Sequence, residues 1–274
     1  MEKPISIATS NVMFGGMAVK ETSGQAHVTD WLLMHYMMLI AKSEDYAQER
    51  LETNNRNPAQ ELIEAHNPDL IVLNEVMPDF NDKIIPVLDE NDYQVVIGRA
   101  KHVPQPMTRA AIIASRFSGE EIDFDIPGKA GSGSCGLSIP DLGLTILALH
   151  PSAFNKKIRQ EQLEFTANRV GEILSEEPKT QIIVAGDFNT GGSELDPYFE
   201  NLPLSRYSLP SFPHSALFQS LGRKKWSWLR KLQDIKNGQK DLDHIFIPSS
   251  WSGVELSTHE TTSDHLALVM KVGI

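Results

Sequence analysis

The chain has 274 residues, of which 41% are hydrophobic and 22% are charged, the composition of an ordinary globular protein. Its single cysteine, Cys135, excludes an intrachain disulfide, and its net charge of −11 is unfavourable for a protein that gains affinity by neutralising many phosphates. The first eight residues lack the pattern of a signal peptide, and the most hydrophobic run, 31–40, is shorter than the roughly 20 residues of a membrane span. We therefore expect a soluble, cytoplasmic protein without a transmembrane segment.

Strands and helices alternate along the chain. The apolar and β-branched runs that predict strands are 5–9, 70–73, 94–98, 109–114, 144–149, 181–185, 242–247 and 266–272. Helices are predicted at 31–51, at 58–66 with Pro58 in the first turn, and at 156–177, where apolar residues recur at spacings of three and four. No linker rich in Pro, Gly or Ser interrupts the pattern. The sequence therefore predicts one α/β domain with a mixed sheet, spanning residues 1–274.

Polar side chains stand at the ends of these predicted strands. They are Asn11, Glu75, His150, Asp187 with Asn189, Asp243, and Asp264 with His265. Carboxylate and amide oxygens suit Mg²⁺, which takes hard oxygen ligands and keeps several waters. A metal held in this way polarises a phosphoryl oxygen, while an imidazole can donate to phosphate or take a proton from water. The set therefore predicts a metal-dependent site for phosphate ester hydrolysis.

The same residues fall within short motifs that resemble those of a known family. In chain order the motifs are Asn11, Asn74-Glu75, His150, Gly186-Asp187-Phe188-Asn189, Leu242-Asp243-His244-Ile245 and Ser263-Asp264-His265. They resemble the endonuclease/exonuclease/phosphatase superfamily, which includes the DNase-I-like nucleases. The resemblance implies a four-layer αββα sandwich, in which two mixed sheets pack face to face between helices. The long gap between Asn11 and Glu75 implies an insertion at 15–57.

The resemblance also implies which residues bind the metal and activate water. Glu75 is expected to be the main carboxylate ligand of Mg²⁺, or of Mn²⁺, with help from Asn11 and Asp264. Asp187 is expected to orient or deprotonate the attacking water. The base is either Asp187 or His265, and the sequence leaves both possibilities open.

The remaining motif residues are expected to act on the phosphate and on the imidazole. The resemblance implies that Asn189 and His150 hold the phosphate and that Asp243 pairs with His265. Considered without the other motifs, Asp243 and His244 could simply begin an edge strand. In the context of the other motifs we expect Asp243 to be functional and His244 to be a solvent-facing or core histidine.

A basic segment at 223–240 contrasts with the acidic chain around it. Seven Lys or Arg residues against one Asp give it a charge of +6, so the remainder carries −17 (−11 minus 6). Candidate substrate contacts in this segment are Lys224, Lys225, Trp226 and Trp228. Cations can follow a phosphate backbone while tryptophans stack on bases. A solvated loop or helix, or a contact with lipid headgroups, accounts for the same residues.

Two other features are weaker candidates for phosphate binding. Arg109 can reach a phosphate from the start of its strand, or form a surface salt bridge. The stretch 128–134 is rich in Gly and Ser but lacks the Gly-Lys-Ser/Thr ending of a phosphate loop. We expect it to be a hairpin loop.

These observations predict a magnesium-dependent hydrolase of phosphate esters, with DNA or RNA as the first choice of substrate. The acidic net charge keeps a second possibility open, a phosphatase or phosphodiesterase acting on a small phospho-metabolite, an inositol phosphate or a phospholipid headgroup. A third possibility is a catalytically silent binding module with the same fold. No obligate protein partner is indicated.

Overall fold

The computed structural model describes residues 4–12, 57–76, 78–99, 110–127, 133–152, 155–208, 242–259, 261 and 266–273. Several sequence predictions lie outside these ranges. They are the helix at 31–51, the insertion at 15–57 apart from its last residue, residues 128–132 of the expected hairpin loop, Arg109, the basic segment at 223–240 with its four candidate contacts, Asp264 and His265.

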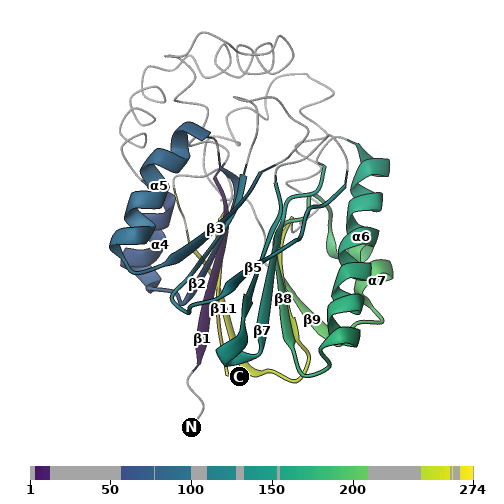
Figure 1. The fold of residues 1–274 in the computed structure, drawn as a ribbon. Helices are drawn as coiled ribbons and strands as arrows, with labels where there is room; N and C mark the ends of the chain where they lie inside the picture. The colour runs from purple at the N-terminus through teal and green to yellow at the C-terminus, as the bar shows by residue number, and fades with distance from the viewer. Residues whose placement is uncertain are drawn as a thin grey trace.

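Two mixed sheets of six strands each form the centre of the molecule (Figure 1). The first sheet has the strand order β11-β12-β1-β2-β4-β3. Its strands are β1 (Ile5–Asn11), β2 (Leu70–Val76), β3 (Gln94–Arg99), β4 (Ala110–Ser115), β11 (Ser252–His259) and β12 (Ala267–Gly273). The second sheet has the order β5-β6-β7-β8-β10-β9. Its strands are β5 (Glu120–Ile122), β6 (Cys135–Ile139), β7 (Leu144–Leu149), β8 (Gln181–Asp187), β9 (Leu204–Ser208) and β10 (Asp243–Pro248).

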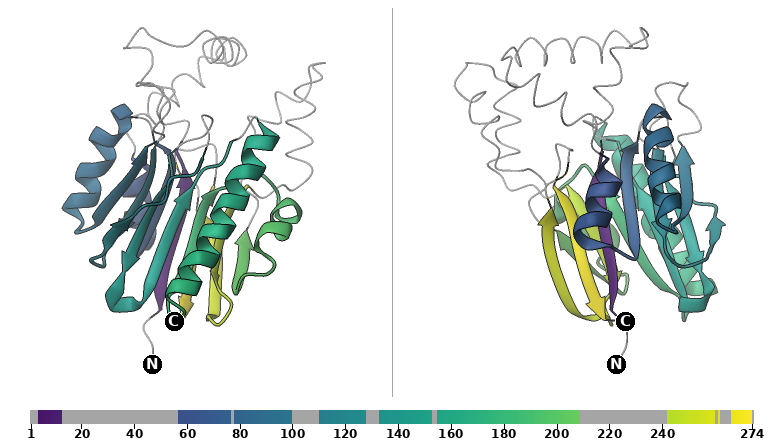
Figure 2. Two further views of the ribbon diagram at one scale, coloured as in Figure 1. Left: turned by 45° about the vertical axis from the view of Figure 1, so that its right-hand side comes forward. Right: turned by 90° about the vertical axis from the view of Figure 1, so that its left-hand side faces the viewer.

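Helices cover the outer faces of both sheets, which confirms the predicted four-layer αββα sandwich (Figure 2). Helices α4 (Pro58–His66) and α5 (Pro78–Glu90) lie on the first sheet, and α6 (Lys156–Glu176) and α7 (Gly192–Phe199) lie on the second. A short 3₁₀ helix, η2 (Pro140–Leu142), precedes β7. Among the helices of the described ranges, none has both the length and the apolar character that a membrane crossing requires.

Side chains that alternate along each strand supply three apolar cores. In β1, Ile5 and Ile7 face the second sheet, whereas Ala8 packs toward the helices. In β8, Ile183 faces the first sheet, whereas Val184 packs toward α6 and α7. Each fully buried Ile or Val contributes roughly 1.5–3 kcal/mol relative to an exposed one. The core between the sheets therefore holds them face to face.

Each sheet contains one parallel pair of strands, and these pairs lie opposite each other. In the first sheet β1 runs parallel to β2, with Asn11 beside Asn74 at the end of the pair. In the second sheet β7 runs parallel to β8, with Leu149 beside Gly186. The two pairs are in contact across the sandwich. The carboxyl ends of four strands therefore meet at one edge of the two sheets.

Gly186 allows a close backbone approach at this edge. Its φ is +148°, and a Cβ built on it would lie 2.1 Å from the carbonyl oxygen of Leu149 and 3.1 Å from Nδ2 of Asn74. Gly171, inside α6, has no atom within 4 Å of its Cβ position.

We predict opposite effects of alanine at these two glycines. Gly186→Ala should lower the free energy of unfolding by about 1–3 kcal/mol, because the backbone of β7 must move. Gly171→Ala should raise it by about 0.5–1 kcal/mol, because alanine is the better helix former. Urea denaturation measures both changes, and equal effects would contradict the close approach at Gly186.

Candidate active site

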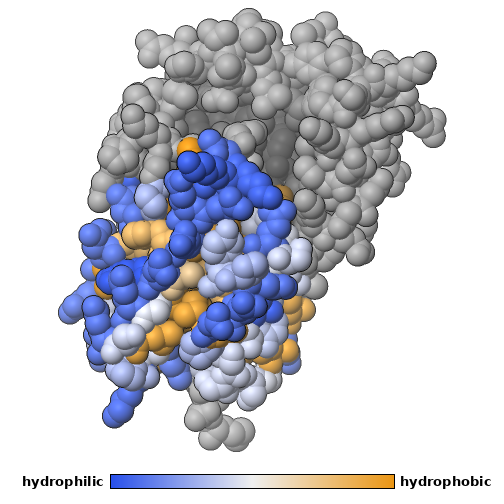
Figure 3. Space-filling view, turned by 90° about the vertical axis from the view of Figure 1, so that its right-hand side faces the viewer, coloured by the Kyte–Doolittle hydropathy of each residue, from blue (hydrophilic) through white to orange (hydrophobic). Residues whose placement is uncertain are grey.

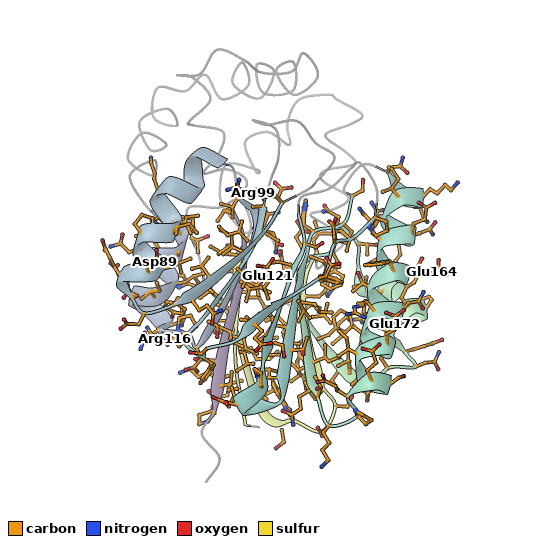
Figure 4. The ribbon with its side chains drawn as sticks, in the orientation of Figure 1. Asp89, Arg99, Arg116, Glu121, Glu164 and Glu172 are labelled. Atoms are coloured by element: carbon orange, nitrogen blue, oxygen red, sulfur yellow. The ribbon has the colours of Figure 1, made fainter. Side chains whose placement is uncertain are left out.

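Five of the predicted site residues come together between the sheets at the ends of the strands. They are Asn11 of β1, Glu75 of β2, His150 after β7, Asp187 of β8 and Asp243 of β10. Each is at most 4% exposed. Arg99, the last residue of β3, marks this end of the first sheet in Figure 4. The apolar core between the sheets is therefore closed at this edge by a polar layer, and we use that term for these five residues.

Both carboxylate oxygens of Asp187 are held by hydrogen bonds. The side-chain amide of Asn11 donates to Oδ2 at 2.8 Å, across the gap between the sheets. The backbone N–H of Asn189 donates to Oδ1, also at 2.8 Å. Because the Asn11 donor comes from the opposite sheet, the position of Asp187 depends on how the two sheets pack.

His150 lies between two buried carboxylates. Its Nε2 is 3.0 Å from Oε1 of Glu75 and 3.7 Å from Oδ2 of Asp187. Burial disfavours the charged imidazole and lowers its pKa, but the neighbouring Glu75 and Asp187 carboxylates outweigh burial and raise the pKa to about 9. In the protein without metal, His150 is therefore a cation at neutral pH.

The backbone of Glu75 directs its side chain into the polar layer. Strict alternation along β2 would turn Asn74 toward the second sheet and Glu75 toward the helices. Instead, the pairing of β2 with β4 shifts register between Leu73 and Val76, and Glu75 has a φ of +57°. A left-handed conformation costs a non-glycine residue roughly 1–2 kcal/mol. The fold tolerates that cost at the residue predicted to be the main metal ligand.

The side chain of Asn189 bridges the loops that follow β7 and β8. Its Nδ2 donates to the carbonyl oxygen of Pro151 at 2.9 Å and lies 2.9 Å from Nε2 of His150. Its φ of +53° is a conformation that asparagine tolerates better than most residues. The two residues predicted to hold the phosphate therefore contact each other directly.

Asp243 lies directly opposite Asp187 on the antiparallel strands β10 and β8. Strand β10 is flanked by β8 and β9, so the possibility that Asp243 begins an edge strand is wrong. The neighbouring His244 is fully buried against Phe188, and its Nε2 lies 3.1 Å from the carbonyl oxygen of Thr190. His244 is therefore a core histidine, one of the two outcomes expected for it.

Two buried polar residues near the site were not given a role by sequence reasoning. Asn74 is fully buried against Gly186, and neither its Oδ1 nor its Nδ2 has a hydrogen-bond partner among the residues that the structure describes. Gln162 of α6 is 1% exposed and binds the loop after β7. In the sequence, Gln162 is a polar residue next to the apolar positions of a predicted helix. Polar residues at such positions are normally expected on the surface.

The donor set of the polar layer fits a divalent cation. Asp187 and Asp243 are buried and directly opposite, an arrangement that is destabilising for like charges, and Glu75 adds a third buried carboxylate. A dipositive ion would offset this charge. Within the described residues, no group of three His, Cys, Asp or Glu side chains is arranged to hold a metal by itself. Water and substrate oxygens would have to complete the coordination, as is usual for Mg²⁺.

Comparisons with known proteins agree on a family. The sequence profile of the Endonuclease/Exonuclease/phosphatase family matches residues 50–265. No curated protein matches the sequence significantly.

Several solved structures share the fold at low sequence identity. An endonuclease/exonuclease/phosphatase from Beutenbergia cavernae is 15% identical with a TM-score of 0.62, covering 99% of this chain and 72% of that one. TDP2 from Caenorhabditis elegans is 14% identical with a TM-score of 0.58, covering 99% and 75%. A mannosyl-6-phosphatase from Bacteroides thetaiotaomicron is 14% identical with a TM-score of 0.57, covering 98% and 100%.

The charge of His150 predicts a pH dependence of stability in the metal-free protein. The pKa of His150 is raised on folding. The free energy that its charged imidazole contributes to folding is therefore fully present below the unfolded pKa of 6.5, and it is lost as the pH rises through about 9. His150→Gln removes the charge but keeps a donor for Glu75. In EDTA, the melting temperature of the variant should lie several degrees below that of the wild type at pH 6, and this difference in melting temperature should be smaller at pH 9.5. A difference that does not change with pH would mean that His150 is neutral in the folded protein.

Proposed function

This chain belongs to the endonuclease/exonuclease/phosphatase family of phosphoester hydrolases, and we propose that it is a magnesium-dependent phosphodiesterase that cleaves nucleic acid. The observation that carries the proposal is the polar layer. Three carboxylates, an imidazole and an amide from five different strand ends are buried together at one edge of an apolar core. Taking charged groups out of water is costly, and pairing them with one another repays that cost only in part. A cation bound at this edge would offset the remainder.

Asp187 is the residue best placed to act on an attacking water. Its two oxygens are fixed by Asn11 and by the backbone of Asn189, so it cannot turn away from the space between the sheets. A positioned carboxylate can orient a water for in-line attack on phosphorus or accept its proton. Sequence resemblance names His265, paired with Asp243, as the other candidate base. We propose that attack is direct and that no covalent phospho-protein forms.

His150 and Asn189 are suited to hold the scissile phosphate. The imidazole of His150 and the side-chain amide of Asn189 lie next to each other, and both can present N–H donors. Donors fixed before the reaction stabilise the charge that develops on phosphoryl oxygens. The Pro151 carbonyl fixes the direction of the Asn189 amide, so this pair is organised before substrate binds.

We propose that Glu75 is the main metal ligand, assisted by Asn11 and Asp264. Since Asn11 uses its Nδ2 on Asp187, its Oδ1 is the atom that can serve a metal. When bound, the metal supplies Lewis acidity to a phosphoryl oxygen and offsets charge on the leaving group. Enzymes of this family generally use divalent metal ions, and Mn²⁺ is the natural substitute for Mg²⁺.

A phosphatase or phosphodiesterase acting on a small phospho-metabolite is the second candidate. The net charge of −11 disfavours long contacts with a nucleic-acid backbone, and one solved structure with this fold is a mannosyl-6-phosphatase. Incubation with plasmid, single-stranded DNA, RNA and a panel of phospho-metabolites, with Mg²⁺ and with EDTA, separates the two. Turnover of a small ester without nicking of any nucleic acid would decide for the second candidate.

We predict that Asp187→Asn abolishes most of the magnesium-dependent turnover of bis-p-nitrophenyl phosphate. The substitution keeps the size of the side chain but removes its charge, and losing a positioned acid–base group costs about 10²–10⁴-fold in kcat. Asp89→Asn, on the exposed surface of α5 (Figure 4), is the matched control and should keep wild-type activity. Wild-type turnover by Asp187→Asn would remove Asp187 from the proposed mechanism.

A further inference from the structure

One peptide group links helix α6 to the phosphate-holding side chain of Asn189. The carbonyl oxygen of Pro151 accepts a hydrogen bond from Nδ2 of Asn189 at 2.9 Å. The N–H of the same peptide group, on Ser152, donates to Oε1 of Gln162 at 2.8 Å. The oxygen and hydrogen of a trans peptide point in opposite directions, so Gln162 and Asn189 hold this planar group from opposite sides. Rotation of the peptide plane would break both bonds at once.

The other end of the Gln162 amide is also fixed. Its Nε2 donates to the carbonyl oxygen of Pro127 at 2.8 Å, which determines which end of the amide faces Ser152. The side chain is 1% exposed, and Ser152 is 2% exposed. A buried amide bonded at both ends cannot exchange its partners for water. The Gln162 acceptor is therefore a fixed point for the peptide between residues 151 and 152.

Gln162 is not needed to make α6 amphipathic. The face of the molecule that carries α6 is largely hydrophilic in its described part, and Glu164 and Glu172 are exposed on this helix (Figure 3, Figure 4). The buried side of α6 contains Leu163, Val170 and Ile173. A methionine would fill the space of Gln162 and bury as well, so packing alone does not call for an amide at this position.

The direction of the Asn189 amide matters because its two ends are chemically different. With Nδ2 donating to the Pro151 carbonyl oxygen, one end of the amide is set as the donor end. If the 151–152 peptide turned, the carbonyl that selects this direction would be lost, and the amide could flip its oxygen toward His150. A phosphate held by N–H donors would then meet an acceptor.

We infer that Gln162 is a positioning residue of the active site, which sets the orientation of the Asn189 amide through the peptide group of Pro151 and Ser152. The part of this inference that concerns turnover rests on the proposed function. The orientation of Asn189 can be tested without any substrate.

The kinetic test uses bis-p-nitrophenyl phosphate with Mg²⁺. Gln162→Met should lower kcat by about tenfold, because the Ser152 N–H loses its acceptor and the 151–152 peptide group is no longer held from both sides. Thr166→Val is the matched control. It removes another buried hydrogen bond of α6, from the Thr166 hydroxyl to the backbone oxygen of Gln162, and should change kcat by less than about twofold.

A double-mutant cycle decides whether Gln162 acts through Asn189. In the Asn189→Ala background, Gln162→Met should have little further effect on kcat, because the group that it positions is gone. A tenfold loss in both backgrounds, or no loss in the wild-type background, would overturn the inference.

A substrate-free measurement separates failure of this inference from failure of the proposed function. In protein labelled with ¹⁵N-asparagine, the side-chain NH₂ signal of Asn189, assigned with Asn189→Asp, should shift in Gln162→Met and stay in place in Thr166→Val. An unchanged signal in Gln162→Met would contradict the inference even if the enzyme is active. A shifted signal in a protein that hydrolyses no phosphate ester would support the positioning role and contradict the proposed function.

Discussion

The site depends on one packing constraint, the contact between the parallel pair β1/β2 of one sheet and the parallel pair β7/β8 of the other. Residues at 11, 75, 150 and 187 are far apart in the chain and share no local structure. They meet because the carboxyl ends of the two pairs lie at the same edge of the sandwich. Strand β10 runs antiparallel to β8, so its first residue, Asp243, reaches that edge from the opposite direction. If one sheet shifted relative to the other, the hydrogen bond between Asn11 and Asp187 would break.

At this edge two features of the structure are locally unfavourable, which is typical of a functional site. Glu75 has a left-handed backbone at a register shift, and Asp187 lies buried opposite Asp243. Backbone strain and buried charge of this kind persist where the surrounding structure holds them in place, and they cluster at functional sites. The imidazolium of His150 offsets part of the charge in the metal-free protein. A divalent cation bound by Glu75 would offset more, which links the electrostatics of the polar layer to metal-dependent chemistry.

The sequence predicted the strands that end at the site better than the elements around them. Helix α4 matches its prediction at both ends, since Asn57 and Pro58 provide a local N-cap and first turn, and Asn67 ends the helix with a left-handed backbone. Helix α5 was missed, and it has a proline, Pro86, within it. Strand β11 was also missed, since its side chains are mostly exposed and it has no apolar run. The turn of Glu75 into the site, and the shared peptide between Gln162 and Asn189, depend on tertiary packing that no single-sequence pattern records.

The central claim is that the polar layer is built around a divalent cation held by Glu75. Calorimetric titration of Mn²⁺ into wild-type protein and into Glu75→Gln tests it most directly, with Glu121→Gln, an exposed residue of β5, as the control. We predict that Glu75→Gln weakens Mn²⁺ binding by at least about tenfold, or roughly 1.4 kcal/mol, while the control binds like the wild type. Equal affinities for all three proteins, or no Mn²⁺ binding by the wild type, would contradict the account.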